Sequence, residues 1–348
     1  MNEQAQSPIR GDAALPRAED WEIFIPRRFF GNAHLQTLAG NFWPRRHALP
    51  PAEARLVEVE SGPAGVSRVL CHCHWRPDPG GRLTLLLLHG LEGSSNSHYM
   101  LGIAAKAWAA GCNVVRMNMR NCGGAEHLSP TLYHSGLSGD VDAVMRDVAR
   151  EKDLRSVALV GYSMGGNLVL KLAGELGEAA PGYLKAVVGV SPAMDLAASA
   201  DALHAPGNRI YEWKFLAGLV RRFRRKARLF PARYSERELR GIRSLRQFDD
   251  RITAPHSGFT GADDYYHRAA SSRVAHRIAV PALILHALDD PFVKMLPPTR
   301  ESLAANPHVS LVETAGGGHC SFLAPADGYD GYWAERRLLE FALRRHRS

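Results

Sequence analysis

Long apolar runs are missing from this sequence. The densest one, near residues 85–88, is far shorter than the roughly 18 residues that a membrane-spanning helix needs, so no transmembrane segment is predicted. The first twenty residues are polar, rich in proline and alanine, and lack the apolar core of a signal peptide. Cysteine is also scarce. The five cysteines form an odd set with no evident disulfide framework: Cys71, Cys73, Cys112, Cys122 and Cys320. These absences lead us to expect a cytoplasmic protein.

Acidic residues are scarce in one segment. Residues 214–246 carry twelve Lys and Arg residues against two acidic residues, Glu236 and Glu238, while the whole chain has a formal net charge of +8. A local excess of positive charge describes the segment that holds it. No nucleic-acid-binding motif accompanies it, and we expect no nucleic-acid partner. The overall composition, 45% hydrophobic and 22% charged, is that of a globular protein.

Short apolar runs alternate with amphipathic segments along most of the chain. Residues 83–88 form a continuous apolar run, which is typical of a strand buried on both faces of a parallel sheet. The pattern predicts strands at residues 55–60, 66–75, 83–88, 113–117, 156–160, 185–190, 280–287 and 310–313, and helices at residues 97–110, 137–151, 164–176 and 332–343. This order predicts an α/β protein with a mostly parallel, doubly wound sheet flanked by helices, as in the α/β-hydrolase fold.

The alternation is interrupted once. Residues 193–277 are too many for a loop and have a helical periodicity of their own, which predicts a cap or lid inserted over the strand ends. The core would then consist of residues 21–192 and 278–348, with residues 1–20 as a flexible tail. Residues 211–230 combine an apolar stripe, which includes Trp213, with several arginines and Lys226. We interpret them as a cap helix that packs inward and exposes a solvated basic face. Contact of the basic residues 214–246 with an anionic membrane is the less favoured alternative.

The strongest chemical signal is the pentapeptide GYSMG at residues 161–165. It lies between the predicted strand 156–160 and the predicted helix 164–176. A serine on so sharp a turn adopts a strained backbone, and the residues two positions away must be small to let strand and helix approach. Gly161 and Gly165 meet that need. The context predicts that Ser163 is a nucleophile whose hydroxyl is exposed above the sheet.

A serine nucleophile needs a base, and the base needs an acid that holds its tautomer. The segment LDDPFV at residues 288–293 follows one late strand, and AGGGHC at residues 315–320 follows the next. His319 is the predicted base, because its glycine-rich loop can turn the ring inward. For the acid, the position directly before the proline favours Asp290 over Asp289, which would then stabilise the loop.

An oxyanion hole requires two amides aimed at the developing charge. One is expected from Met164, directly after the nucleophile. The other is expected from Leu91, in the HGLEG segment at residues 89–93 that follows the strand 83–88; His89 itself is interpreted as structural.

The CHCH run at residues 71–74 alternates across the faces of a strand, so at most two of its side chains could converge on a metal. We expect no metal and no cofactor, and we interpret Cys320 as a packing residue.

With these residues assembled, the chain resembles the YheT-like branch of the α/β-hydrolases, which is related to the eukaryotic abhydrolase-domain enzymes. The resemblance runs from about residue 34 to the C-terminus. It depends on the motifs HLQT at 34–37, LHGLEGSS at 88–95, NMRNCGG at 118–124, YHSG at 133–136, FDD at 248–250, DYY at 264–266 and DDPF at 289–292.

The resemblance implies a triad of Ser163, Asp290 and His319 that hydrolyses small-molecule or lipid-like acyl esters without a cofactor. The chain departs from the eukaryotic members in lacking an N-terminal membrane anchor, which puts a bilayer substrate in doubt. It also has Asn121 where a glycine is common, a change that the sequence does not explain.

Hydrolysis through an acyl-enzyme is the expected function, and two alternatives remain. The same triad could pass the acyl group to an alcohol, which would make the protein an acyltransferase or ester synthase. The scaffold could also serve a non-catalytic binding protein, although all three triad positions are filled. An epoxide hydrolase or dehalogenase would need an aspartate at the position of Ser163 and is disfavoured.

Overall fold

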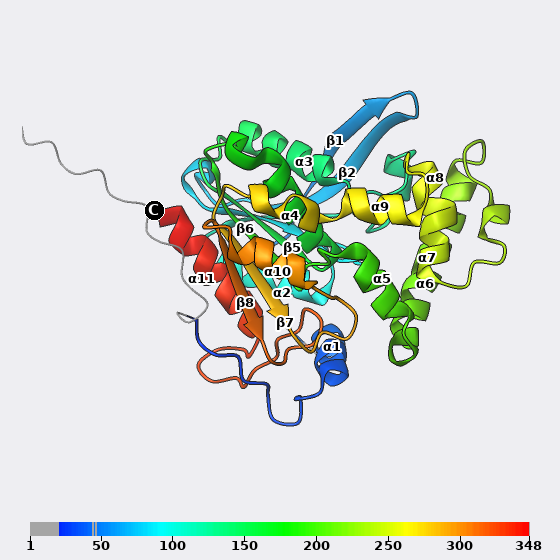
Figure 1. Ribbon diagram of the computed structural model, residues 1–348. Coiled ribbons are helices and arrows are strands. Elements are labelled where there is room, and N and C mark those ends of the chain that lie inside the picture. Colours follow the sequence, from blue (N-terminus) through cyan, green and yellow to red (C-terminus); the bar gives the residue numbers. More distant parts are fainter. Residues whose placement is uncertain (1–20, 44, 46, 348) are drawn as a thin grey trace, which may run out of the picture.

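The computed structural model describes residues 21–43, 45 and 47–347, so the predicted tail at residues 1–20 lies outside the described residues. Across the described residues, eight strands form one sheet in the order β1-β2-β4-β3-β5-β6-β7-β8 (Figure 1). β2 pairs antiparallel with β1 and with β4, and all other neighbours are parallel. The strands are β1 (Glu53–Gly62), β2 (Gly65–His74), β3 (Thr84–Leu88), β4 (Asn113–Met117), β5 (Val157–Tyr162), β6 (Leu184–Val190), β7 (Ala282–Ala287) and β8 (Val309–Thr314).

The sheet is covered on both faces, as the apolar run of β3 predicts. Leu86 and Leu88 of β3 belong to the hydrophobic core on one face, and Leu85 and Leu87 belong to the core on the other. Helices α3 (Ser138–Glu151) and α4 (Met164–Leu176) pack on the first face, and α2 (His98–Ala109) and α11 (Trp333–Arg347) pack on the second. This arrangement confirms the predicted doubly wound α/β fold.

Two helices of the core were not predicted. Helix α1 (Ala33–Phe42) begins after Asn32, whose side chain accepts hydrogen bonds from the amides of the first turn. Helix α10 (Pro297–Ala304) connects β7 to β8 along the chain. Before α1, Trp21 and Phe24 pack into the second core, so the N-terminal part of the described chain is anchored on the domain. None of the helices in the described part of the chain has the length and apolarity that crossing a bilayer requires.

Residues 193–277 are all described, and every regular element among them is helical. In Figure 1 these helices lie together beside the sheet, on the side away from α11. We call this stretch the helical segment 193–277. Its helices are α5 (Leu196–His204), α6 (Arg209–Leu229), α7 (Leu245–Phe248), α8 (Ala254–His256) and α9 (Ala262–Ala269).

Helix α6 packs inward through Leu219 and Phe223, as its apolar stripe predicts. Two details of that prediction are wrong. Trp213 points outward and is 71% exposed. The basic face is solvated only in part, because Lys226 is fully buried and its ammonium donates to the carbonyl oxygens of Glu126 and Ser129. Carbonyl groups buried under a helix need a donor, and Lys226 supplies it.

Candidate active site

Ser163 stands on the turn between β5 and α4, with φ 53° and ψ −117°. Two glycines make this turn possible. A Cβ atom at Gly161 would overlap the carbonyl oxygen of Gly165, and a Cβ atom at Gly165 would lie 2.5 Å from the carbonyl oxygen of His89. Strained backbone of this kind persists only where the surroundings hold it, and it is common at functional sites. The requirement for small residues at both positions is thus met as predicted.

Asp290 and His319 lie in contact, on the loops that follow β7 and β8. Nδ1 of His319 is 2.7 Å from Oδ2 of Asp290. The other carboxylate oxygen, Oδ1, accepts the amides of Phe292 at 3.1 Å and Val293 at 2.8 Å. The Asp290 side chain is fully buried. The two backbone amides fix the carboxylate, and the carboxylate fixes the ring, since a carboxylate can only accept the hydrogen of Nδ1.

The loop that carries His319 is held from two sides. Oδ1 of Asp289 accepts the amide of Gly318 at 2.9 Å, so Asp289 acts as the predicted loop-stabilising carboxylate. Oγ1 of Thr37, on α1, accepts the amide of His319 itself at 2.9 Å. The contact of Thr37 was missed from the sequence, although the motif HLQT at residues 34–37 belongs to the family resemblance.

Cys320 contributes more than packing. Its Sγ lies 3.6 Å from Nε2 of His319, on the ring edge opposite Asp290. Burial lowers the pKa of His319. The Cys320 sulfur and the Asp290 carboxylate raise it by more than burial lowers it, so the pKa is above its ordinary value of 6.5. A base must be neutral to accept a proton, and the neighbours of His319 therefore set the pH range in which it can act.

The segment that follows β3 faces the serine. A Cβ atom at Gly90 would lie 3.1 Å from Cβ of Ser163, and the amide of Gly90 donates to the Tyr99 hydroxyl at 2.9 Å. Met164 is the first residue of α4, where helix amides have no acceptor within the helix. Leu91 and Met164 both line a pocket together with Ser163. His89 is buried and its Nε2 accepts the amide of Met119, as a structural residue would.

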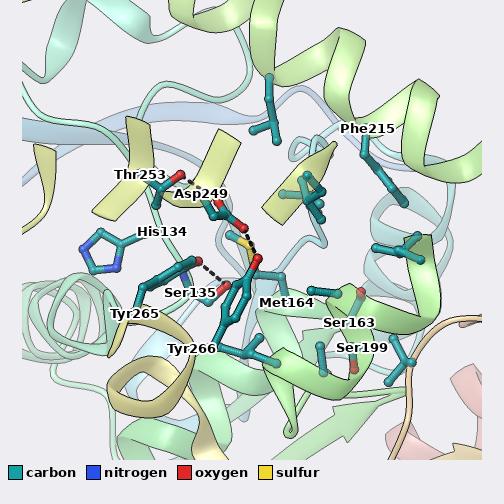
Figure 2. Close-up of a pocket in the computed structure, with 18 of the residues that line it drawn as sticks. His134, Ser135, Ser163, Met164, Ser199, Phe215, Asp249, Thr253, Tyr265 and Tyr266 are labelled. Carbon is teal, nitrogen blue, oxygen red and sulfur yellow. Dashed lines mark hydrogen bonds between the residues drawn. The ribbon is translucent and has the colours of Figure 1, made fainter. Parts of the chain in front are cut away.

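Two pockets meet at Ser163, and the inner one is mostly apolar. It lies between the core and the helical segment 193–277. Figure 2 shows Ser163, Met164 and Phe215 around it. Its apolar lining comes mainly from Leu91, Met164, Leu196, Ala200, Leu203, Phe215, Leu219, Leu245, Phe292 and Val293.

Polar groups line the part of the inner pocket at which the helical segment 193–277 meets the core. Asp249 begins a single turn of π-helix, Asp249–Thr253, and accepts hydrogen bonds from Tyr266 at 2.7 Å and Thr253 at 2.8 Å (Figure 2). Burial raises the pKa of Asp249 to about 6, and the two hydroxyl groups limit that rise. The Tyr265 hydroxyl donates to Ser135 Oγ at 2.9 Å. Of the polar residues named here, all except Thr253 belong to motifs on which the family resemblance depends.

The outer pocket opens on the other side of Ser163. Leu91, Phe215 and Phe292 line both pockets, so the two are continuous at the serine. The outer pocket also contains His319 and Cys320, and its mouth lies between α1 and α6. The described residues lining that mouth include Leu38, Ile210, Tyr211, Lys214, Gly218 and Arg221.

The backbone of Asn121 explains why a glycine is common at this position. Its φ is 63°, in the left-handed region that glycine favours and asparagine tolerates. The side-chain amide donates to the carbonyl oxygen of Thr131 at 2.9 Å. Asparagine therefore replaces glycine at modest cost and adds a hydrogen bond.

The CHCH run lies on β2 and its side chains diverge. Cys71 and Cys73 are in the hydrophobic core, whereas His72 contacts Ser95 and His74 contacts Arg116. Among the described residues, no group of three or more His, Cys, Asp or Glu side chains is arranged to hold a metal ion.

Comparisons with known proteins agree on one family. The sequence profile described as alpha/beta hydrolase fold matches residues 84–325. The chain is 34% identical, over 90% of its length and 91% of the relative, to the Escherichia coli (strain K12) protein YheT, which is named as a candidate esterase. It is 31% identical to the Mus musculus protein named phospholipase ABHD3, over 74% of this chain and 61% of that protein. The Saccharomyces cerevisiae protein named monoacylglycerol lipase is 28% identical, over 71% of this chain and 56% of that protein.

Solved structures share the fold at lower sequence identity. The Pyrobaculum calidifontis esterase superposes with a TM-score of 0.54 at 17% identity, over 89% of this chain and 88% of that one. The Pyrococcus furiosus esterase Pf2001 superposes with a TM-score of 0.51 at 16% identity, over 86% of this chain and 98% of that one.

Proposed function

This chain belongs to the α/β-hydrolase family, in its YheT-like branch, and from that premise we propose that it hydrolyses carboxylic esters with Ser163 as nucleophile, His319 as base and Asp290 as the orienting acid. The observation that carries the proposal is the conjunction of a strained serine turn with a buried Asp290–His319 pair at the same end of the sheet. Each of these features alone occurs for structural reasons. Together they would supply a nucleophile and a base that line one pocket, with the orienting carboxylate buried against the base.

In the proposed mechanism, Ser163 Oγ attacks the ester carbonyl carbon and its proton passes to Nε2 of His319. Asp290 holds the hydrogen on Nδ1 and stabilises the imidazolium that forms. The tetrahedral intermediate then expels the alcohol, which takes the proton from Nε2. Water then gives a proton to Nε2 of His319 and attacks the acyl carbon. The second tetrahedral intermediate breaks its bond to Ser163 Oγ, which takes the proton back from Nε2, and the acid is released. Nε2 faces Cys320 in this structure, and catalytic hydrogen bonds commonly tighten only when substrate is bound.

Backbone amides complete the proposed site. The amides of Leu91 and Met164 would hold the oxyanion that forms at the carbonyl oxygen. Met164 is well suited, because α4 begins there and the positive end of the helix dipole favours the developing charge. Each such donor contributes about 3–4 kcal/mol to lowering the barrier, judged from the loss on removal of a comparable donor.

The two pockets divide the substrate. We propose that the apolar acyl chain lies in the inner pocket, against Leu196, Ala200 and Phe215, and that the alcohol part leaves through the outer pocket. In this proposal the helical segment 193–277 is a cap, since it supplies most of the apolar wall of the inner pocket. The preferred substrate class is then an ester with an apolar acyl group.

Labelling by a fluorophosphonate, combined with turnover of p-nitrophenyl acyl esters, tests the proposal. Ser163→Ala is expected to abolish both while its thermal unfolding stays that of the wild type. Ser302→Ala, on α10 and lining neither pocket, is the matched control and should retain both. Full labelling of Ser163→Ala, or a wild type that reacts with neither reagent, would contradict the proposal.

A further inference from the structure

The turn that carries Leu91 contains a strained residue. The amide of Gly93 donates to the carbonyl oxygen of Gly90 at 3.0 Å, which closes a turn over residues 90–93. Its third residue, Glu92, has a φ of 58°. Glycine or asparagine ordinarily occupies such a position, and another residue persists there only where contacts hold it. Contacts of the Glu92 side chain must therefore hold this conformation.

That side chain is fixed by the cap on one side and by the core on the other. Nε of Arg222, on α6, donates to Oε1 of Glu92 at 3.0 Å, and Nη2 donates to Oε2 at 3.2 Å. The hydroxyl of Tyr133 donates to Oε1 at 2.6 Å. The side chains of Glu92 and Arg222 are only 15% and 14% exposed. A two-point ion pair shielded from water has a defined geometry and is weakly screened by salt.

Helix α6 approaches the same carboxylate with its backbone. Gly218 lies four residues before Arg222, on the same face of the helix. A Cβ atom at Gly218 would overlap Oε2 of Glu92. Arg222 also donates to the carbonyl oxygen of Asn121. Gly218 thus lets helix α6 approach the turn closely, and Arg222 binds the helix to the turn through Glu92.

We propose that Glu92 and Arg222 are positioning residues that couple helix α6 of the cap to the oxyanion amide of Leu91. This inference rests on the proposed function, because it gives Leu91 a catalytic amide. The first residue of the turn, Gly90, is held by Tyr99 of the core. The carboxylate of Glu92 holds the turn from the cap side, and it acts through the backbone. The cap therefore not only encloses the acyl chain but also sets the position of one oxyanion donor.

The test separates this coupling from a general loss of structure. Glu92→Gly suits the left-handed backbone and removes the carboxylate, Glu92→Gln keeps acceptor and shape, and Arg222→Met removes the cation. Arg225→Met is the matched control, since Arg225 lies on the same helix and joins it to Glu126 at 2.9 Å without touching the turn. For each variant, kcat and KM for a p-nitrophenyl ester are measured, together with the inhibition constant of a trifluoromethyl ketone, whose hemiketal adduct with the serine places an oxyanion in the hole.

Glu92→Gly and Arg222→Met should each lower kcat by about 10- to 100-fold, less than the 100- to 1,000-fold loss caused by removing a donor outright, because the amide is displaced and still present. KM should change little, and the trifluoromethyl ketone should weaken by the same factor as kcat. The double variant should be no worse than either single variant, since both remove one coupling. Glu92→Gln should retain most of the activity, and Arg225→Met should match the wild type.

Equal kcat values for Glu92→Gly, Arg222→Met and the wild type would overturn this inference and leave the proposed function standing. A loss of the same size in Arg225→Met would also overturn the inference, because any ion pair between helix α6 and the core would then have the same effect as the Glu92–Arg222 pair. If Glu92→Gly did not fold, Arg222→Met and Glu92→Gln would carry the comparison. A wild type without esterase activity would overturn the proposed function, and the inference with it.

Discussion

The two neighbouring aspartates after β7 offer a sharp test of the triad, because the structure gives them different partners. Asp290 uses Oδ1 for the amides of Phe292 and Val293 and Oδ2 for Nδ1 of His319. Asp289 accepts the amide of Gly318. Asp290→Asn and Asp289→Asn are therefore the same chemical change, made one residue apart, with different expected results.

In Asp290→Asn, the side-chain oxygen must stay on the two backbone amides, and the NH₂ group then faces Nδ1 of His319. A donor opposite Nδ1 favours the tautomer with hydrogen on Nε2, and that nitrogen can no longer accept the proton of Ser163. The comparable change in serine proteases lowers kcat by about 10⁴-fold, or roughly 5 kcal/mol of barrier. Asp289→Asn keeps an acceptor for Gly318, so its kcat should fall by no more than about tenfold, the cost of one weakened hydrogen bond.

The assay is turnover of p-nitrophenyl butyrate at several pH values, with the concentration of competent sites counted by fluorophosphonate labelling. Circular dichroism and thermal unfolding check that both variants fold. The reasoning is refuted if Asp289→Asn loses as much activity as Asp290→Asn, or if Asp290→Asn stays within tenfold of the wild type.

Three further predictions concern the pocket and its titrating groups. Cys320→Ser removes one of the groups that raise the pKa of His319, so the acid limb of kcat/KM should move to lower pH; an unmoved limb would contradict this. The pKa of Asp249 is raised to about 6 from 3.8, so between those pH values the folded protein binds more protons than the unfolded one and loses stability as the pH rises. Asp249→Asn lacks that titration. Between pH 4 and pH 7, the free energy of unfolding of the wild type should therefore fall by up to roughly 3 kcal/mol relative to that of Asp249→Asn, as urea unfolding at each pH would show. Ala200→Phe fills the inner pocket and should lower kcat/KM for octanoyl esters at least tenfold more than for acetyl esters; equal losses would place the acyl chain elsewhere.

The central strands of the sheet were predictable because they are buried on both faces. β3, β4 and β6 therefore appear as short, mostly apolar runs, and their predicted limits differ from the observed ones by a residue or less. β5 extends beyond its predicted end at residue 160, because Gly161 and Tyr162 continue the ladder with β6 up to the serine. Helix α10 was missed because it begins with two prolines and buries little besides Leu303, which leaves no apolar periodicity to detect.

The positions of Ser163, Asp290 and His319 were predictable because each lies on the turn or loop that follows a strand, and the carboxyl ends of parallel strands meet at one edge of the sheet. The structure places Asp290 against His319, and the catalytic role of all three stays a prediction. Side-chain contacts between the helical segment 193–277 and the core were beyond sequence reasoning. Arg222 was assigned to a solvated face, yet it is paired with Glu92, which lies 130 residues earlier in the chain. No local pattern reports such a pairing.

The pocket also holds a second nucleophilic side chain, Cys320, next to the same histidine. The central claim is that the acyl group passes through Ser163. The most direct measurement is mass spectrometry of the protein quenched in acid during turnover of a p-nitrophenyl ester, followed by peptide mapping. We predict one added acyl mass on the peptide that contains GYSMG, localised to Ser163 and lost in Ser163→Ala. An acyl group on the peptide that contains Cys320, or a burst of product with no acylated peptide, would contradict the account.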